Sequence, residues 1–221
     1  KLPEINKRIQ MVKEIREKSS REETRKLAGT PSLFAENRQP NTSYIVIPRH
    51  SSENRKYIPM GFFDKEYIVS DSCLAISNAK IFHFGILESL IHMSWVNYVC
   101  GKLENRFRYS NEIVYNNFPF PENPTEKQIK KVEEKAKKIL EIRKEFPNSS
   151  LSDLYNVLSM PPKLFKAHNE LDKAVDLCYS NQIFESQNKR MEFLFDLYNK
   201  YNEPLLNFKK EKKGSKPSFS R

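Results

Sequence analysis

Three charged residues, Glu104, Arg106 and Arg108, occupy every second position of one short stretch. Glutamate can accept a hydrogen bond from cytosine N4, and arginine can donate two hydrogen bonds to guanine O6 and N7. In an extended chain alternate side chains project from opposite faces, so these charges and Lys102 would share one face. The opposite face would carry apolar side chains, namely Leu103, Phe107 and Tyr109. The spacing fits either a row that reads base edges or a solvated strand face with alternating charges.

A polar loop earlier in the chain offers side chains of the kinds that contact nucleic-acid phosphates. Its candidates are Arg49, Ser51, Ser52, Arg55 and Lys56, and Lys102 of the charged stretch is a further candidate for phosphate contact. Such side chains often fix a protein on DNA by binding phosphate oxygens, without reading the base sequence. The same residues can equally pin the loop to the rest of the fold, and the sequence leaves both interpretations open.

Motifs for catalysis and for metal binding are missing from the sequence. It contains no Gly-rich turn for a cofactor, no nucleophile elbow and no nuclease-like set of carboxylates with a lysine. The four histidines are not grouped at metal-ligand spacing, and we expect His83, His92 and His168 to be structural. The three cysteines form no C-x-x-C pair, which argues against a disulfide framework or a zinc site. We therefore expect no catalytic residue, bound metal or cofactor within this chain.

The chain carries a formal net charge of +10, and the excess lies at its two ends. Residues 1–27 contain nine Lys and Arg against five Asp and Glu, and residues 207–221 contain six against one. A basic tail either favours nucleic acid without sequence preference or serves only as a solubilising segment. Neither a run of 18 apolar residues nor a signal-peptide pattern occurs, so we expect no membrane partner and a cytoplasmic location.

The hydrophobic pattern of the first half of the chain predicts an α+β fold. Apolar residues at helical spacing predict an amphipathic helix over residues 2–27. A wider apolar stripe over residues 83–100 predicts one buried helix packed against a sheet. Short β-rich runs predict a small mixed or antiparallel sheet, with strands near residues 43–47, 57–63, 67–70 and 74–76.

A proline-rich hinge at residues 116–124 predicts a domain boundary, because proline cannot donate a backbone hydrogen bond and favours extended geometry. Beyond the hinge, apolar residues recur at helical spacing and predict an all-α C-terminal domain. The expected segments are a leading helix (1–27), an α+β domain (28–121), a helical C-terminal domain (122–206) and a disordered basic tail (207–221).

The stretch from Pro48 to Phe62 resembles the target recognition domain of MmeI-like, or Type IIL, restriction–modification enzymes. Further motifs agree with that family in the same order along the chain. They are Arg25–Leu27, Arg38–Pro40, Ser70–Cys73, His83–Leu87, Arg108–Ser110 and Ile113–Pro121. The last of these looks like the family's boundary with a C-terminal domain, and the resemblance runs from about residue 2 to residue 206.

The resemblance implies that the chain is the DNA-reading part of a larger protein. That family fuses a nuclease, an adenine-N6 methyltransferase and a helical spacer, of which residues 1–27 would be the end. S-adenosylmethionine and Mg²⁺ would bind in those catalytic parts, which are not in this chain. The implied partners are duplex DNA and, in cis, the methyltransferase domain. The implied base-reading residues are Glu104, Arg106 and Arg108, together with an upstream pair, Asp71 and Ser72.

Two other functions are weighed against this one. A protein-interaction module would pack its helical half on a partner and leave the charged row solvated, and it would not bind duplex DNA in a salt-dependent way. A free-standing nuclease or methyltransferase would need a metal or cofactor motif, and the sequence shows none.

Overall fold

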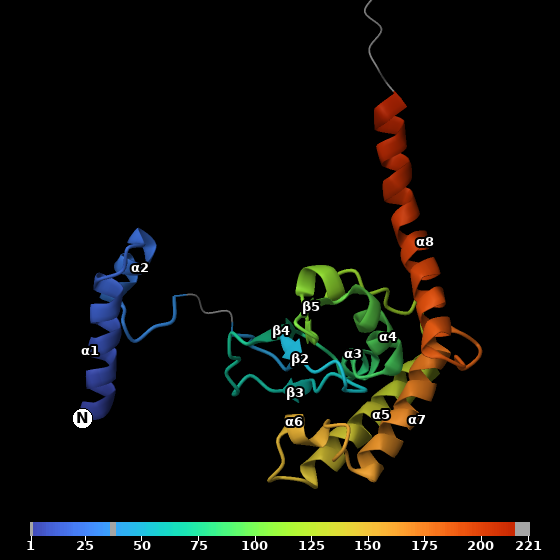
Figure 1. Cartoon of the computed structure of the whole chain (residues 1–221), viewed down its shortest axis with the longest axis horizontal. Helices are drawn as coiled ribbons and strands as arrows, with labels where there is room; N and C mark the ends of the chain where they lie inside the picture. The colour runs from blue at the N-terminus through green and yellow to red at the C-terminus, as the bar shows by residue number, and fades with distance from the viewer. Residues whose placement is uncertain (1, 36–38, 215–221) are drawn as a thin grey trace, which may run out of the picture. The chain divides into compact units, whose positions relative to one another are not determined.

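The structure is a computed structural model that describes residues 2–35 and 39–214, with side chains through residue 203. The chain divides into two compact units, residues 1–39 and residues 40–221, and each is described by itself. Helices combine with small antiparallel sheets (Figure 1), which confirms the expected α+β class. Arg38 of one family-like motif and residues 215–221 of the expected tail lie outside the described residues. No described helix is both long and apolar enough to cross a lipid bilayer.

The N-terminal unit contains two helices, so the single helix expected over residues 2–27 is wrong. Its elements are α1 (Pro3–Glu17), α2 (Glu22–Lys26) and the 3-10 turn η1 (Leu27–Gly29). Between α1 and α2, the Arg25 guanidinium binds the backbone carbonyls of Ser19 and Ser20, and the Ser19 hydroxyl accepts from the Arg21 N–H. Such local bonds compete with the helical pattern and favour a break. Arg16 of α1 binds three carbonyls of the segment that folds back after α2.

The second unit opens with sheet A, a three-stranded antiparallel sheet with the order β3-β1-β4. Its strands are β1 (Tyr44–Pro48), β3 (Gly61–Phe63) and β4 (Cys73–Ser77). Two expected strands change. Only the end of the run 57–63 forms a strand, and Tyr57 and Ile58 before it bury their side chains in the core. The run 67–70 forms no strand, since it belongs to the connection that leads from β3 to β4.

The buried helix expected over residues 83–100 is two helices, α3 (Ile81–Leu87) and α4 (Leu90–Val99). Both carry buried residues, which confirms that they pack into the core. The helix breaks at Glu88, whose carboxylate accepts hydrogen bonds from the Met60 backbone N–H and from Arg143, each at 2.8 Å. Ser89 reinforces the break by donating from its hydroxyl to the Ile86 carbonyl at 2.6 Å.

A second antiparallel sheet, sheet B, has the order β2-β6-β5. Its strands are β2 (His50–Ser51), β5 (Gly101–Leu103) and β6 (Arg106–Arg108). The chain reverses at Glu104 and Asn105, so residues 101–108 form a hairpin and the expected single extended row is wrong. A short π-helical turn, η2 (Asn111–Tyr115), follows β6 and leads to the proline-rich hinge.

The rest of the described chain, up to residue 214, is the helical region, as its periodicity predicted. It consists of α5 (Glu126–Lys144), α6 (Leu151–Leu154), α7 (Pro162–Tyr179) and α8 (Gln187–Gly214). Thr125 begins α5 through a capping box with Gln128, in which each side chain binds the other's backbone N–H. Residues 207–214, expected to be disordered, continue α8, because their lysines and glutamate have good helix propensity and no glycine interrupts them before residue 214.

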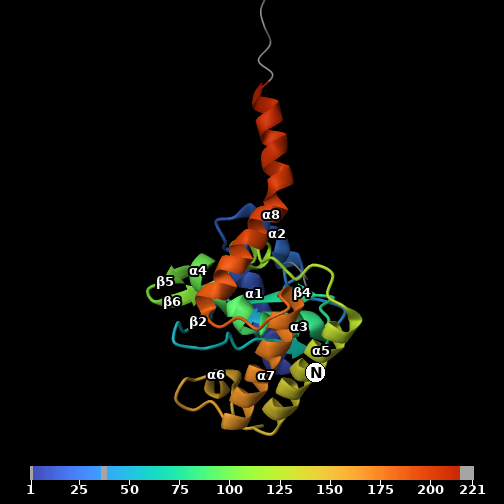
Figure 2. The same ribbon diagram turned by 90° about the vertical axis from the view of Figure 1, so that its right-hand side faces the viewer.

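The α+β region and the helical region share one hydrophobic core, although a hinge separates them in sequence. Buried apolar side chains from both regions form a single cluster. Helix α3 packs against α5 and α4 packs against α8 (Figure 2). Gly85 allows α3 to lie close to α5, because a Cβ at this position would lie 2.6 Å from Val132 Cγ1. The helical region therefore supports the sheets that carry the predicted site residues.

Candidate nucleic-acid interface

The hairpin places the two predicted arginines on one face of sheet B. Across the hairpin, Leu103 pairs with Arg106, Lys102 with Phe107, and Gly101 with Arg108. Directly opposed residues of an antiparallel pair share a face. Arg106 and Arg108 therefore lie with Leu103, which is exposed, while Lys102 lies with Phe107, which is buried. The expectation that Lys102 shares the face of the arginines is wrong, because the turn reverses the chain between them.

Glu104 occupies the turn itself and contacts Arg106. Its carboxylate Oε2 accepts a hydrogen bond from Arg106 Nη2 at 2.8 Å, and the two side chains are 75% and 58% exposed. Glu104 has a φ of 56°, in the left-handed region that favours glycine and asparagine. The pair thus stands at the tip of the sheet with both charged groups open to solvent.

Strand β2 adds a histidine to the arginine face, which sequence reasoning did not find. His50 is opposite Arg108 and Ser51 is opposite Phe107. His50 is exposed and Ser51 is buried, which is the same alternation that β6 shows. We call the exposed face formed by His50, Leu103, Arg106 and Arg108 the hairpin face. The pairing of β2 with β6 left no signal in the sequence, because the two strands are more than 50 residues apart.

Arg49 brings the second predicted pair, Asp71 and Ser72, next to sheet B. Its guanidinium Nε donates to the Asp71 carbonyl at 2.8 Å, and its backbone N–H donates to the Ser72 carbonyl at 3.0 Å. Its own carbonyl accepts from the Tyr109 N–H at 2.8 Å, directly after β6. Asp71 and Ser72 are both exposed. Arg49 therefore joins the turn of Asp71 and Ser72 to the residue that follows β6.

The loop that follows β2 is attached to the helical region by two of its predicted phosphate-binding residues. Arg55 Nη2 donates to Ser152 Oγ at 2.6 Å. Lys56 Nζ donates to Asn169 Oδ1 at 3.2 Å and lies 4.3 Å from the centre of the Phe165 ring. Burial lowers the pKa of the Lys56 ammonium. These contacts pin the loop in the protein without DNA.

The histidines expected to be structural are held by hydrogen bonds. His92 is buried between the Leu87 carbonyl, 2.8 Å from Nδ1, and the Tyr109 hydroxyl, 2.9 Å from Nε2. Burial lowers the pKa of His92 to about 3. His168 is buried beside the Tyr155 hydroxyl at 2.7 Å, and burial lowers its pKa well below the usual value. Both imidazoles are therefore neutral core groups, as the sequence predicted.

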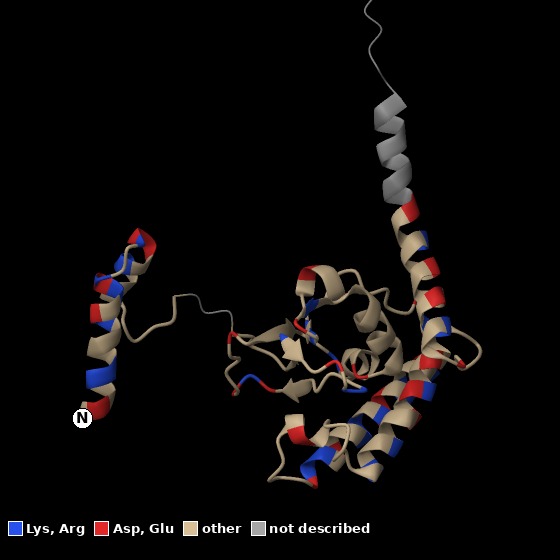
Figure 3. Cartoon of the chain, in the orientation of Figure 1, with Lys and Arg blue, Asp and Glu red and all other residues tan. Residues whose placement is uncertain are grey.

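Charged residues on the helical region are mixed in sign. Lysines and glutamates alternate along α5 and α8 (Figure 3), and several of them pair at helical spacing. One example is Lys131 with Glu134 at 3.1 Å on α5. Mixed signs give little net attraction for a phosphate backbone. The described part of the helical region therefore resembles a support for the sheets more than a DNA-binding surface.

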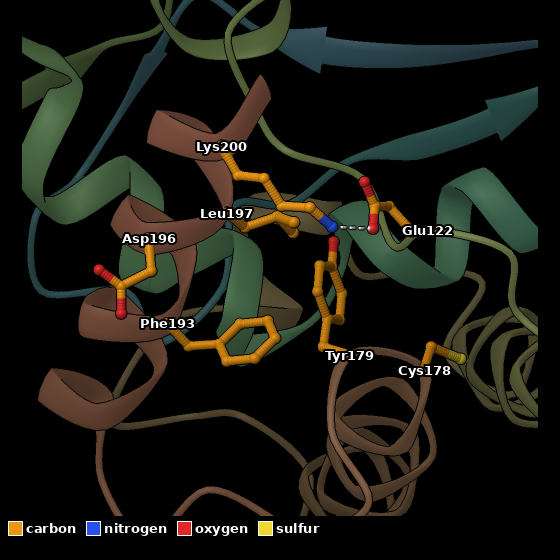
Figure 4. A pocket seen from close by; sticks show the side chains of 7 residues that line it. All are labelled: Glu122, Cys178, Tyr179, Phe193, Asp196, Leu197 and Lys200. Carbon is orange, nitrogen blue, oxygen red and sulfur yellow. Dashed lines mark hydrogen bonds and ion pairs between the residues drawn. The ribbon is translucent and has the colours of Figure 1, made fainter. Parts of the chain in front are cut away.

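A hollow of about 430 Å³ lies between the hinge, the end of α7 and the start of α8 (Figure 4). Its one lysine, Lys200, is paired with Glu122 at 2.8 Å, and the Tyr179 hydroxyl donates to the Pro119 carbonyl. These contacts join the helices to the hinge, so the hollow has a structural explanation. Among the described residues, no three His, Cys, Asp or Glu side chains are grouped to hold a metal ion.

Two family models together match nearly the whole described chain. Residues 1–122 match the target recognition domain of MmeI, and residues 124–206 match the C-terminal domain of MmeI. The chain belongs to the MmeI family. In that family's terms, both sheets and the hairpin face lie in the target recognition domain, and α5, α6 and α7 lie in the C-terminal domain.

Two relatives of the MmeI-family chain show the same similarity. A curated protein of Bacillus subtilis (strain 168), DNA methyltransferase A, is 41% identical over 201 residues, which are 91% of this chain and 23% of that protein. A solved structure of the Type IIL restriction–modification enzyme MmeI in complex with DNA is 45% identical, with a TM-score of 0.80. The match covers 89% of this chain and 26% of that structure. The chain thus spans about a quarter of the length of each relative.

Proposed function

We propose that this chain reads a specific sequence of duplex DNA as the specificity part of a restriction–modification protein. The observation that carries the proposal is the hairpin of residues 101–108, which presents Glu104 and Arg106 together at the tip of a sheet. Both side chains are of the types that pair with base edges in the major groove. Arg108 lies on the same face, and the solved MmeI relative was determined in complex with DNA.

The Glu104–Arg106 contact suggests how one base pair is read. In the free protein the two side chains bind each other, and an exposed ion pair of this kind contributes only about 0–1 kcal/mol. On DNA, Arg106 would donate to guanine O6 and N7, while Glu104 would accept from N4 of the paired cytosine. Each such contact favours the correct base by about 1–3 kcal/mol. Exchanging the internal pair for base contacts therefore gives a net gain in specificity.

Backbone strain at Glu104 supports a role for its carboxylate. Three non-glycine residues of the described chain have positive φ, namely Asn78, Glu104 and Asn123. Asparagine tolerates this conformation, whereas other residues with a Cβ lose roughly 1–2 kcal/mol there. Strained backbone is concentrated at functional sites. A glutamate at the turn is therefore better explained by what its side chain binds than by the needs of the turn.

Asp71 and Ser72 form the second proposed reading position, because Arg49 holds their turn beside sheet B. For phosphate contact, Lys102 is exposed and lies on the hairpin, opposite Phe107. Five further proposed phosphate contacts have internal partners or are buried in the free protein: Arg49, Ser51, Ser52, Arg55 and Lys56. They would bind phosphate only if DNA displaced those bonds.

Catalysis, in this proposal, belongs to parts of the parent protein outside this chain. The parent would be an adenine-N6 methyltransferase that uses S-adenosylmethionine and also an endonuclease that uses Mg²⁺. The methyltransferase domain would be the partner of this chain in cis, and the parent would work in the cytoplasm. One recognition domain would then direct both activities to the same DNA sequence.

The test uses the full-length protein that carries this chain, expressed in a host without its own DNA methylation. Single-molecule sequencing would give the methylated motif for the wild type and for the double variant Glu104→Lys, Arg106→Asp. The proposal predicts that the motif changes at one base pair and keeps the others. The matched control exchanges another exposed ion pair, with Lys189→Glu and Glu192→Lys, and should leave the motif unchanged.

Three other results would count against parts of the proposal. An unchanged motif in the double variant would show that Glu104 and Arg106 do not read bases. Loss of all methylation in a folded variant would support a role in binding but contradict reading of a single base pair. A wild type that methylates nothing would overturn the restriction–modification assignment and favour a protein-interaction module.

A further inference from the structure

The segment from β2 to β3 is held at its far end by the helical region. Tyr57 follows the loop 52–56, and its hydroxyl donates to Asp172 Oδ2 on α7 at 2.7 Å. The other oxygen of Asp172 accepts from the Leu90 backbone N–H at the start of α4, also at 2.7 Å. Tyr57 and Asp172 are 1% and 4% exposed. One buried carboxylate of the helical region thus binds two parts of the recognition region.

Arg143 on α5 makes a second attachment of the same kind. Its Nη1 donates to the Met60 carbonyl at 2.7 Å, and its Nη2 donates to Glu88 at 2.8 Å. Met60 lies directly before β3, so this bond fixes the end of the segment that begins at β2. Arg143, like Asp172, is buried. Two charged side chains of the helical region therefore determine where the segment 52–60 lies.

The near end of the same segment is sheet B. His50 and Ser51 of β2 pair with β6, which carries Arg106 and Arg108. Strand β2 is an edge strand of only two residues, so its own pairing gives it few hydrogen bonds. Arg49 joins β2 to β1 on one side, and the loop that leaves β2 on the other side also helps to determine its position next to β6. The contacts that hold that loop come from Ser152, Asn169 and Asp172.

We propose that Asp172 is a positioning residue for DNA reading, which acts through Tyr57 on β2 and the adjoining loop. The inference rests on the proposed function. The helical region then belongs to the reading apparatus, although none of its residues needs to touch a base. When the Tyr57–Asp172 bond is lost, β2 and the loop shift relative to β6, and the hairpin face no longer meets the base edges in one fixed geometry.

The chain offers a matched control one helical turn away. Asp176 is also on α7 and also buried, and its carboxylate binds Arg190 at 2.6 Å and the Phe184 N–H at 3.4 Å. Both partners belong to the connection after α7 and to α8, not to the recognition region. Asp176→Asn leaves a buried arginine without its carboxylate, so it should destabilise the chain at least as much as Asp172→Asn does.

The experiment compares the wild type with Tyr57→Phe, Asp172→Asn and Asp176→Asn. The full-length protein that carries each variant is used to select from a pool of duplexes with ten randomised base pairs, and the bound DNA is sequenced. Affinity for the duplex that the wild type selects, and for its single-base variants, is then measured by fluorescence anisotropy at one salt concentration, well below each melting temperature. Hydrogen exchange at the Tyr109 amide, which is bonded to the carbonyl of Arg49 directly before β2, reports on how the start of β2 is attached beside the end of β6.

We expect Tyr57→Phe and Asp172→Asn to reduce discrimination between the selected duplex and its variants by about 5- to 10-fold, the lower range of coupling between two sites. Both variants should also exchange the Tyr109 amide faster. Asp176→Asn should lower the melting temperature, but its discrimination between duplexes and its exchange rate at the Tyr109 amide should equal those of the wild type. Tyr57→Phe removes a single oxygen atom, so this variant still tests the inference if Asp172→Asn does not fold.

Unchanged discrimination in Tyr57→Phe would overturn the inference while leaving the proposed function intact. Equal losses in Tyr57→Phe and Asp176→Asn would also overturn it, because the effect would then follow stability alone. A full-length wild-type protein that selects no sequence from the pool would overturn the proposed function, and this inference with it.

Discussion

Arg143 and Glu88 form a buried ion pair that joins the two regions of the chain. The Nη2–Oε1 distance is 2.8 Å, and the side chains are 7% and 0% exposed. Glu88 also ends α3, while Arg143 also binds the Met60 carbonyl next to β3. One pair therefore fixes a helix break, a strand start and the docking of α5. We therefore expect the stability of the chain to fall when either partner is lost.

Arg143→Met should destabilise the chain by about 3–5 kcal/mol, because it leaves the Glu88 carboxylate buried without a cation. Chemical denaturation of the purified chain measures this loss. The double variant Arg143→Met, Glu88→Gln should recover part of it, since the uncompensated charge is then gone. Lys189→Met is the control, because its pair with Glu192 is exposed and should contribute at most about 0.5 kcal/mol. A loss below 1 kcal/mol in Arg143→Met would contradict the importance of the buried pair.

His92 should make the stability fall in acid. Its pKa is lowered from 6.5 to about 3 by burial, so between these pH values the unfolded chain binds a proton that the folded chain does not. Stability due to this group therefore falls as pH falls through that window, by up to about 1.4 kcal/mol per pH unit. His92→Asn keeps a donor for the Leu87 carbonyl but does not titrate. The stability difference between wild type and variant, measured by urea denaturation, should narrow from pH 6.5 to pH 4, and a constant difference would refute this account.

Asp172 should make stability depend on pH in the opposite direction to His92. Burial raises its pKa from 3.8 to about 6, despite the hydrogen bonds that it accepts. Between these values the folded chain binds the extra proton, so this contribution to stability falls as pH rises from about 4 to about 6. In Asp172→Asn the loss of stability in acid should therefore be steeper than in the wild type over the same window. Parallel curves for the two proteins would show that Asp172 does not titrate in this range.

Gly85→Ala should destabilise the chain, although alanine is the better helix former by about 1 kcal/mol. The added Cβ would lie 2.6 Å from Val132 Cγ1 and 3.3 Å from Ala136 Cβ, where α3 meets α5. Crowding of a packed core costs about 1–3 kcal/mol. Thermal unfolding of the variant measures the balance. The compensating variant Gly85→Ala, Val132→Ala should restore part of the stability, and a stabilised single variant would show that α3 and α5 can move apart freely.

Glu104→Gly should separate stability from DNA reading. Glycine relieves roughly 1–2 kcal/mol of strain at positive φ. Because glycine loses more conformational freedom on folding, it also costs about 0.5–1 kcal/mol, so the stability should stay equal or rise by up to about 1.5 kcal/mol. Removal of the carboxylate should nevertheless abolish discrimination at one base pair in the duplex selection. Asn123→Gly, at a φ of 48°, is the control for the backbone change alone and should leave the selection unchanged. A Glu104→Gly chain that selects the wild-type sequence would mean that the strain has no role in reading.

Hydrophobic periodicity by itself determined the α+β class, the positions of most helices and the burial of His92 and His168. These features depend on neighbours three or four residues away, which the sequence displays directly. It also placed β1 and β4 almost to the residue. The helix break at Glu88 was missed, because the Glu88 carboxylate is bound by Met60 and Arg143, which are 28 and 55 residues distant.

The hairpin shows most clearly what only the tertiary structure decided. Alternation of charged and apolar residues over 102–109 looks the same in one strand and in a two-residue hairpin, so the sequence could not show that Lys102 and the arginines face opposite ways. It could not show either that Lys56 and Tyr57 bind the helical region, since Asn169 and Asp172 lie 113 and 115 residues further on. The sequence determines which side chains are available for reading DNA. Long-range packing determines which of them are held inside the protein and which remain exposed on the hairpin face.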